Sequence, residues 1–79
     1  MIRDEIRGFV SERFLALHPG VDPADSDDLL SLGVIDSLGF VELVEHVEAT
    51  YGLAVQDVEI TEENFGSIAA IAGFVEARR

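Results

Sequence analysis

The chain has 79 residues, which leaves room for one small domain, because compact domains usually contain about 50–200 residues. Its hydrophobic fraction of 48% is high enough for a folded core and unlike the composition of a disordered tail. Sixteen acidic and five basic residues give a net charge of −11, which disfavours nucleic acid and anionic membranes as partners and favours a protein with a basic surface.

A first helix is predicted over residues 2–18, because apolar residues recur there every three or four positions. The set is Ile2, Ile6, Phe9, Val10, Phe14 and Leu17. Pro19 and Gly20 then end the helix. A long connection leads to Asp36, and its apolar residues between Leu29 and Ile35 are expected to fill the core. We therefore expect an ordered loop there, with room for one short turn of helix.

A second helix is predicted from Ser37 to Tyr51, since Asp36 and Ser37 are both good N-caps and Gly52 is a natural stop. A helical wheel assigns one arc of this helix to the core. That arc consists of Phe40, Leu43, Val44, Val47 and Tyr51.

The last third of the chain predicts a loop, a short helix and a final helix. Residues 55–60 have the composition of a strand, but a lone strand would leave its backbone groups unpaired, so we expect a connecting loop. Thr61 caps a helical turn that Gly66 ends, and Ser67 caps the final helix. The sequence therefore predicts one all-α domain over residues 1–79, a small bundle of three main helices and one short helix.

The outward arc of the second helix combines aliphatic and acidic residues: Leu38, Val41, Glu42, Glu45 and Glu48. Two aliphatic residues among three carboxylates suggest a docking surface, although scattered exposed apolar residues are normal on any protein. The pattern alone leaves both interpretations open. Ser37 lies at the edge of this arc, where position alone gives it the role of a cap. His46 lies half a turn of angle away and more than two turns along the axis, so it is not expected to act as a base for Ser37.

Cysteine and lysine are absent from the sequence, and His18 and His46 are its only histidines. Disulfides, thiolate nucleophiles, Cys-ligated zinc and lysine Schiff bases are therefore excluded. The charged start of the chain lacks the apolar core of a signal peptide, and no apolar run approaches the roughly 20 residues of a membrane span. We expect a soluble cytoplasmic protein, not inserted in a membrane, that mutual repulsion keeps monomeric.

The segment Leu32-Gly33-Val34-Ile35-Asp36-Ser37-Leu38 resembles the phosphopantetheine attachment motif of acyl and peptidyl carrier proteins, in which Asp-Ser-Leu precedes the second helix. The resemblance extends over the whole chain, including its acidity, long first loop and short third helix. It implies an acyl-carrier-like four-helix bundle that carries 4′-phosphopantetheine, derived from coenzyme A, on Ser37. A helix start tolerates the charge of a phosphodiester, and the arm would supply the thiol that holds acyl or aminoacyl groups as thioesters.

The resemblance also implies partners and their contacts. Asp36 would help to place the serine for a phosphopantetheinyl transferase, and partner enzymes would recognise Leu38, Val41, Glu42, Glu45 and Glu48. Those partners would be an adenylating or acyl-transferring loading enzyme and downstream condensing or tailoring enzymes, bound weakly and salt-sensitively. Gly39 stands where fatty-acid carriers usually have an acid, which we interpret as a recognition position without its charge.

The motif Gly-Val-Ile-Asp-Ser-Leu and the lack of a linker at either end of the sequence favour a freestanding carrier of a nonribosomal peptide, polyketide or D-alanyl pathway. A housekeeping carrier of fatty acid biosynthesis is an alternative. Another is an acidic helical interaction module without a prosthetic group, which would need the acids of the second helix but not the Ser37 hydroxyl. The tethered group itself cannot be deduced from the carrier sequence.

Two further functions find little support in the sequence. A calcium loop could use Asp22, Asp25, Asp27 and Asp28, but counting from Asp22 places Asp27 and Gly33 where an EF-hand has its glycine and glutamate. The register therefore fails, and no metal site is expected. An enzyme is also not expected, because neither a catalytic triad nor the spacing of a phosphate-binding loop is present.

Overall fold

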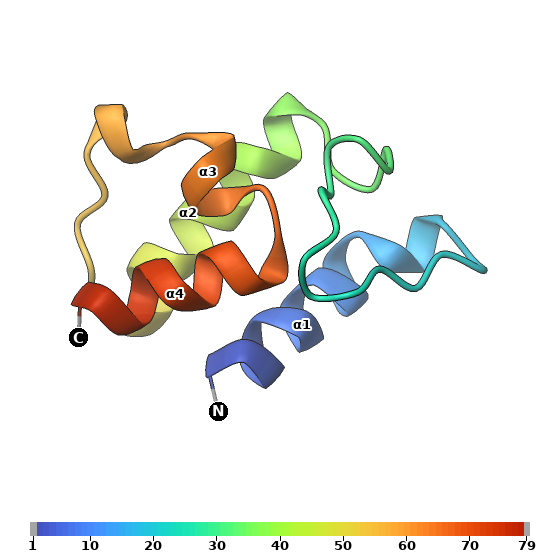
Figure 1. Ribbon diagram of the computed structural model, residues 1–79, viewed down its shortest axis with the longest axis horizontal. Helices are drawn as coiled ribbons and strands as arrows, with labels where there is room; N and C mark the ends of the chain where they lie inside the picture. The colour runs from blue at the N-terminus through green and yellow to red at the C-terminus, as the bar shows by residue number, and fades with distance from the viewer. Residues whose placement is uncertain (1, 79) are drawn as a thin grey trace.

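The computed structural model describes residues 2–78, which form helices, turns and loops and contain no strand. The four α-helices are α1 (Ile2–Arg13), α2 (Ser37–Tyr51), α3 (Glu62–Phe65) and α4 (Ile68–Arg78). Two 3₁₀ turns, η1 (Leu15–Leu17) and η2 (Asp57–Glu59), lie in the connections. This arrangement confirms the predicted all-α four-helix fold with a short third helix (Figure 1). No helix in the described range has both the length and the apolar character that crossing a bilayer requires.

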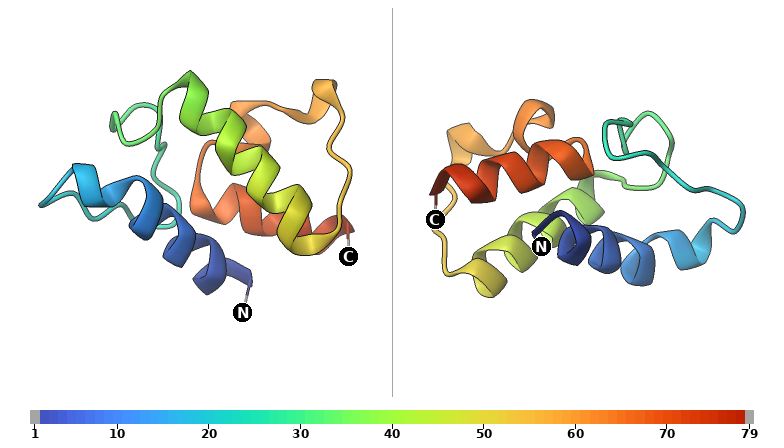
Figure 2. Two further views of the ribbon diagram at one scale, coloured as in Figure 1. Left: turned by 180° about the vertical axis from the view of Figure 1, so that it is seen from behind. Right: turned by 60° about the horizontal axis from the view of Figure 1, so that its bottom comes forward.

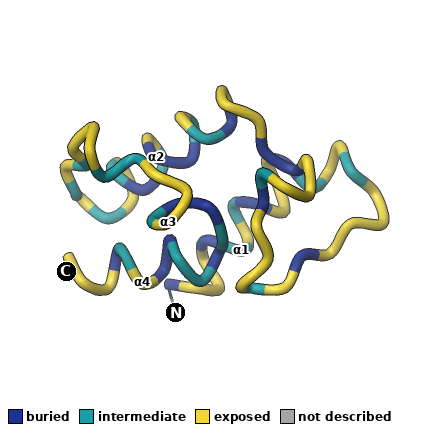
Figure 3. The backbone as a smooth tube through the Cα atoms, turned by 45° about the horizontal axis from the view of Figure 1, so that its top comes forward, coloured by how far each residue is buried: buried dark blue, intermediate teal, exposed yellow. Residues whose placement is uncertain are grey.

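The helices surround a core to which all four of them and the long loop contribute. α1 packs mainly on α4, and seen from behind α2 lies over α4 with α1 to one side (Figure 2). The buried stretches, drawn dark blue in Figure 3, alternate with exposed ones along each long helix. At the centre, Phe65 of α3 is fully buried and contacts the rings of Phe40 and Phe74, with centroids 6.2 and 5.0 Å away.

The first helix ends at Arg13, so the predicted extent to residue 18 was wrong. Phe14 still donates its N–H to Val10 O at 2.9 Å, but its φ of −116° departs from the helical value, and after it the chain tightens into η1. The Phe14 ring is buried in the core. As a result Leu17, which the periodicity assigned to the buried face, is 79% exposed. Phe14 is buried as the helical period predicts, whereas the change to a 3₁₀ turn after it takes Leu17 off the buried face.

The long connection between α1 and α2 is ordered, as expected, and consists of turns. Leu29, Val34 and Ile35 are buried and fill the core. Two backbone hydrogen bonds fasten the loop to the corner between α3 and α4: Leu29 N–H donates to Gly66 O, and Ala69 N–H donates to Asp25 O, both at 2.8 Å. The loop is thus fixed against the junction of α3 and α4.

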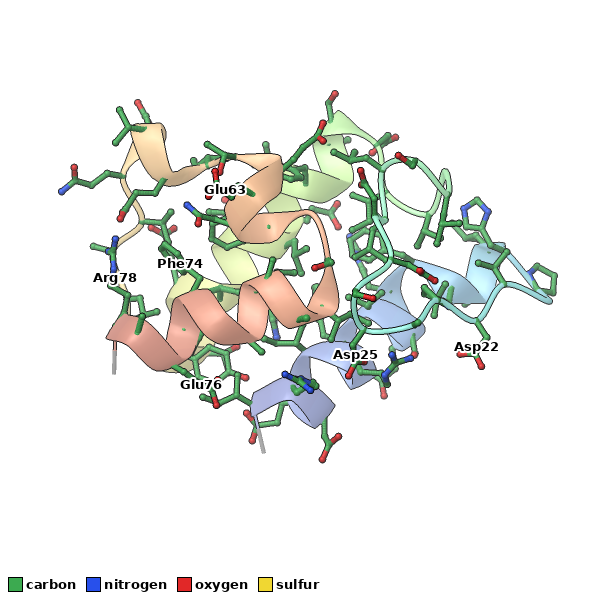
Figure 4. The ribbon with its side chains drawn as sticks, viewed as in Figure 1. Asp22, Asp25, Glu63, Phe74, Glu76 and Arg78 are labelled. Atoms are coloured by element: carbon green, nitrogen blue, oxygen red, sulfur yellow. The ribbon has the colours of Figure 1, made fainter. Side chains whose placement is uncertain are left out.

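Ion pairs tie connections to helices at both ends of the fold (Figure 4). Arg3 and Arg7 of α1 pair with Asp25 in the long loop. Arg78 of α4 pairs with Glu59 of η2 and lies over the Phe74 ring, 4.7 Å from its centroid. Residues 55–60 therefore form a loop with one 3₁₀ turn, as predicted for this segment in place of a strand.

Candidate functional site

Ser37 is the first residue of α2, and it is exposed at the end of a helix whose start is fixed by its neighbour. Asp36 is the N-cap: its Oδ1 accepts the Gly39 N–H at 2.8 Å and its carbonyl accepts the Phe40 N–H at 2.9 Å. The capping role that position alone gave to Ser37 belongs to Asp36. Among residues 2–78, no side chain or backbone group is hydrogen-bonded to the Ser37 hydroxyl, which leaves it available.

The residues before the serine hold it in place. Gly33 has φ +75°, the left-handed conformation that glycine adopts without strain, and its N–H donates to Leu30 O. Val34 and Ile35 then enter the core, each 4% exposed. Because buried residues immediately precede Asp36 and the helix immediately follows it, Ser37 has a fixed position although its side chain faces solvent.

A shallow pocket of ≈ 250 Å³ opens beside Ser37, between the starts of α2 and α3. It is lined by Leu30, Ser37, Phe40, Ile60, Thr61 and Glu62. The N–H groups of the first turn of α2 lie at the positive end of the helix dipole, which stabilises a bound phosphate. Exposure, a free hydroxyl and a helix N-terminus are the properties that a phosphodiester on Ser37 requires, so the residues present fit that group.

The outward residues of α2 differ in how available they are. Leu38 and Val41 are 70% and 50% exposed, and Glu45 is exposed without an intramolecular partner in the described range. The other two acids are partly buried and already bonded, Glu48 to the Val55 N–H at 2.9 Å and Glu42 to Arg13 Nε at 2.7 Å. The hydrogen bond from Arg13 lowers the pKa of Glu42 below its ordinary value.

Gly39 is buried, which contradicts its interpretation as a surface recognition position without its charge. A Cβ added there would lie 2.9 Å from Phe14 Cε1 and 3.0 Å from Ile35 Cγ2. A larger side chain has no room unless these neighbours move. Glycine at this position therefore allows Phe14 to pack directly against the first turn of α2.

His46 belongs to a different part of the molecule. Its ring stacks on that of Phe9 of α1, with centroids 3.7 Å apart and planes 9° apart, and burial lowers the pKa of the imidazole. It lines a groove of ≈ 740 Å³ with residues of α1 and the end of α2, whereas Ser37 lines the pocket beside α3.

The acidic residues of the long loop have structural partners. Asp22 and Asp25 pair with Arg7, and Asp27 accepts the Ala24 N–H at 2.8 Å. Asp28 accepts hydrogen bonds from the Leu30 N–H and from the Ser31 hydroxyl. Within the described part of the chain, no three acidic or histidine side chains are arranged to hold a metal ion.

Comparison with known proteins shows the family to which the chain belongs. Residues 6–75 match the family described as "Phosphopantetheine attachment site". The chain belongs to this family of phosphopantetheine-binding carrier proteins, and its cofactor is covalently attached 4′-phosphopantetheine.

Several relatives carry a more specific name. The chain is 36% identical over 50 residues to the "D-alanyl carrier protein" of Streptococcus pyogenes serotype M5 (strain Manfredo), and equally to that of serotype M1. The alignment spans 63% of this chain and 63% of each relative.

A solved structure is also similar. A chain in a "Crystal structure of FAD-dependent dehydrogenase" superposes with a TM-score of 0.70 and 30% sequence identity. The match covers 89% of this chain and 97% of that one, so the matched chain is close in size to this protein.

Proposed function

We propose that this carrier protein holds acyl or aminoacyl groups as thioesters on a phosphopantetheine arm attached to Ser37 and presents them to partner enzymes. The observation that carries the proposal is the exposed Ser37 hydroxyl at the start of α2, released from capping because Asp36 accepts the Gly39 N–H. The arm supplies the thiol that forms the thioester, and this chain supplies a fixed point of attachment.

Attachment is a phosphoryl transfer to Ser37. Its Oγ forms a bond to the pantetheine-bearing phosphorus of coenzyme A, the bond from that phosphorus to 3′,5′-ADP breaks, and the serine proton leaves to a base of the transferase. The resulting phosphodiester carries a negative charge at the N-terminus of α2, where the dipole and the free N–H groups stabilise it. Because coenzyme A is an intracellular donor, we place this reaction in the cytoplasm.

Partner enzymes would dock on the outward face of α2. Leu38 and Val41 offer an apolar centre and Glu45 a free carboxylate, while Glu42 and Glu48 become available only if they exchange their present partners. Asp36 is the residue that positions Ser37 for the transferase, by fixing the helix start. Such a small and charged interface suits weak, salt-sensitive binding and successive hand-over between enzymes.

The comparisons favour an aminoacyl cargo and an oxidative step. The relatives named D-alanyl carrier proteins favour loading by an adenylating enzyme. The similarity to a small chain in a structure of an FAD-dependent dehydrogenase favours a tailoring partner whose flavin accepts two electrons from the tethered group. A secondary-metabolite pathway would combine both steps.

Intact mass after incubation with coenzyme A, magnesium and a broad-specificity phosphopantetheinyl transferase tests the attachment site. The native chain should gain one phosphopantetheine, Ser37→Ala should gain none, and Ser11→Ala, at an exposed serine of α1, should react like the native chain. If the Ser37→Ala chain were modified, the phosphopantetheine would be attached to another residue. If the native chain keeps its helical structure but is not modified, the acidic helical interaction module without a prosthetic group becomes the better explanation of this protein's function.

A further inference from the structure

A second groove flanks the first turn of α2, on the side facing α1. It has a volume of ≈ 510 Å³ and does not include Ser37 in its lining. Phe14, Val34 and Gly39 contribute buried surface, whereas Leu17 of η1 and Leu38 of α2 are among the most exposed apolar side chains of the described chain. The groove runs along the contact between Phe14 and Gly39, and residues of η1 and of the first turn of α2 border it.

The groove has an acidic border. Asp36 uses only Oδ1 to hold the Gly39 N–H, and its carboxylate is exposed. Glu42 lies along the same groove and is bonded to Arg13, which also lines it. Arg13 and Glu42 balance each other, and His18, which also lines the groove, is counted as neutral, so Asp36 leaves a formal charge of about −1 within a protein of net charge −11. A complementary occupant therefore has an apolar side chain with a cation beside it.

The position of the groove beside Ser37 indicates which class of partner enzyme would contact it. An enzyme that works at the far end of a tethered arm has no need to touch the residues beside the serine. An enzyme that forms the bond to Ser37 Oγ has to cover them, and both neighbours in sequence, Asp36 and Leu38, line the groove. That enzyme also binds the phosphates of coenzyme A, which requires cationic side chains close to the reacting serine.

We propose that this groove receives an apolar side chain of the phosphopantetheinyl transferase that loads Ser37, with a transferase cation opposite Asp36. The proposal rests on the function proposed above. It places Leu17 of η1, a residue outside the outward face of α2, in the transferase interface.

The test measures kcat/KM for loading by the broad-specificity transferase with coenzyme A as co-substrate. Leu17→Glu should lower kcat/KM at least about tenfold, mainly through KM, because the apolar contact is lost and a charge is buried. Val58→Glu is the matched control, since Val58 is 81% exposed in η2 and lies outside the groove. It adds the same charge and should change kcat/KM less than about twofold. Circular dichroism and melting temperature establish that both variants are folded.

Each outcome is decisive. A native chain that takes no phosphopantetheine disproves the proposed function itself. If the native chain is loaded and Leu17→Glu and Val58→Glu have equal kcat/KM, the carrier function is supported, but the groove is not a docking site of the transferase. If the two variants are loaded equally well, and if the native protein is a dimer that Leu17→Glu dissociates, the groove binds a second copy of this chain. That result would also contradict the proposal.

Discussion

Gly39 and Phe14 illustrate how one missing Cβ shapes the site. Gly39→Ala should lower the free energy of unfolding by about 1–3 kcal/mol, because the added methyl group overpacks the contact with Phe14 and Ile35. The Phe14 ring also packs edge-on against the Phe9 ring, with ring centroids 5.9 Å apart. A movement of Phe14 away from Gly39 would therefore disturb that contact. Urea denaturation measures the change.

Gly73→Ala provides the control for that substitution. Gly73 is exposed in α4, and an added Cβ there meets no atom within 4 Å. Alanine should therefore stabilise the protein by up to about 1 kcal/mol. If both alanine variants shifted stability in the same direction, the close packing at Gly39 would be contradicted.

His46 should make stability depend on pH. Burial lowers its pKa in the folded state, so the unfolded chain takes up a proton first as the pH falls below about 6.5. The free energy of unfolding should then decrease from pH 7 down to the folded-state pKa. His46→Gln should flatten this slope in urea titrations at a series of pH values, and equal slopes for the two proteins would contradict the assignment.

The helix termini were predictable from the sequence because their signals are local. Thr61 Oγ1 accepts the Asn64 N–H at 3.2 Å, Ser67 Oγ accepts the Ala70 N–H at 3.0 Å, and Gly52 ends α2 with φ +67°. Each signal lies within a few residues of the bond it makes. The position of the candidate serine at the start of α2 follows from the same kind of signal.

Contacts between distant residues were not predictable. The Arg13–Glu42 pair joins residues 29 positions apart, and neither residue type specifies its partner. The close contact between Phe14 of the first connection and Gly39 of α2 is of the same kind, and the sequence pattern does not pair these two residues. The candidate serine and the outward face of α2 were therefore predictable from local patterns, whereas the groove beside them was not.

The long loop should depend on Leu29 for its anchorage. Leu29→Ala should cost about 2–5 kcal/mol of unfolding free energy, because Leu29 is fully buried and its loss leaves a cavity. The Ala69 N–H, bonded to Asp25 O across the same junction, should exchange faster with solvent. Urea denaturation and amide hydrogen exchange measure the two effects.

Leu32→Ala is the comparison for the loop, since Leu32 is 46% exposed in the same segment. This variant should change stability by less than about 0.5 kcal/mol. Similar losses for the two leucines would mean that the loop is not anchored through Leu29.

The whole molecule carries far more negative than positive charge. Its extents of 33 × 25 × 19 Å are comparable with a Debye length of about 30 Å at 0.01 M salt, so its carboxylates repel each other across the fold. Raising NaCl from about 0.01 M to about 0.3 M should therefore increase the melting temperature, although it weakens the arginine ion pairs.

A variant with fewer acids checks the origin of that salt effect. Glu45 and Glu76 are exposed and have no ion-pair partner in the described range, so Glu45→Gln/Glu76→Gln removes repulsion without breaking a contact. The double variant should melt higher at low salt and respond less to NaCl. An unchanged salt response would rule out carboxylate repulsion as its cause.

The fixed position of Ser37, set by the buried Val34 and Ile35 and the capped start of α2, also bears on reaction rates. With the proposed arm attached there, the freedom of the cargo comes from the arm alone. Once a partner has docked, the thioester meets its active site as an intramolecular reactant, at an effective concentration of the order of millimolar for a short flexible tether. Within the complex, the local concentration of the thioester is then independent of how dilute the carrier is in solution.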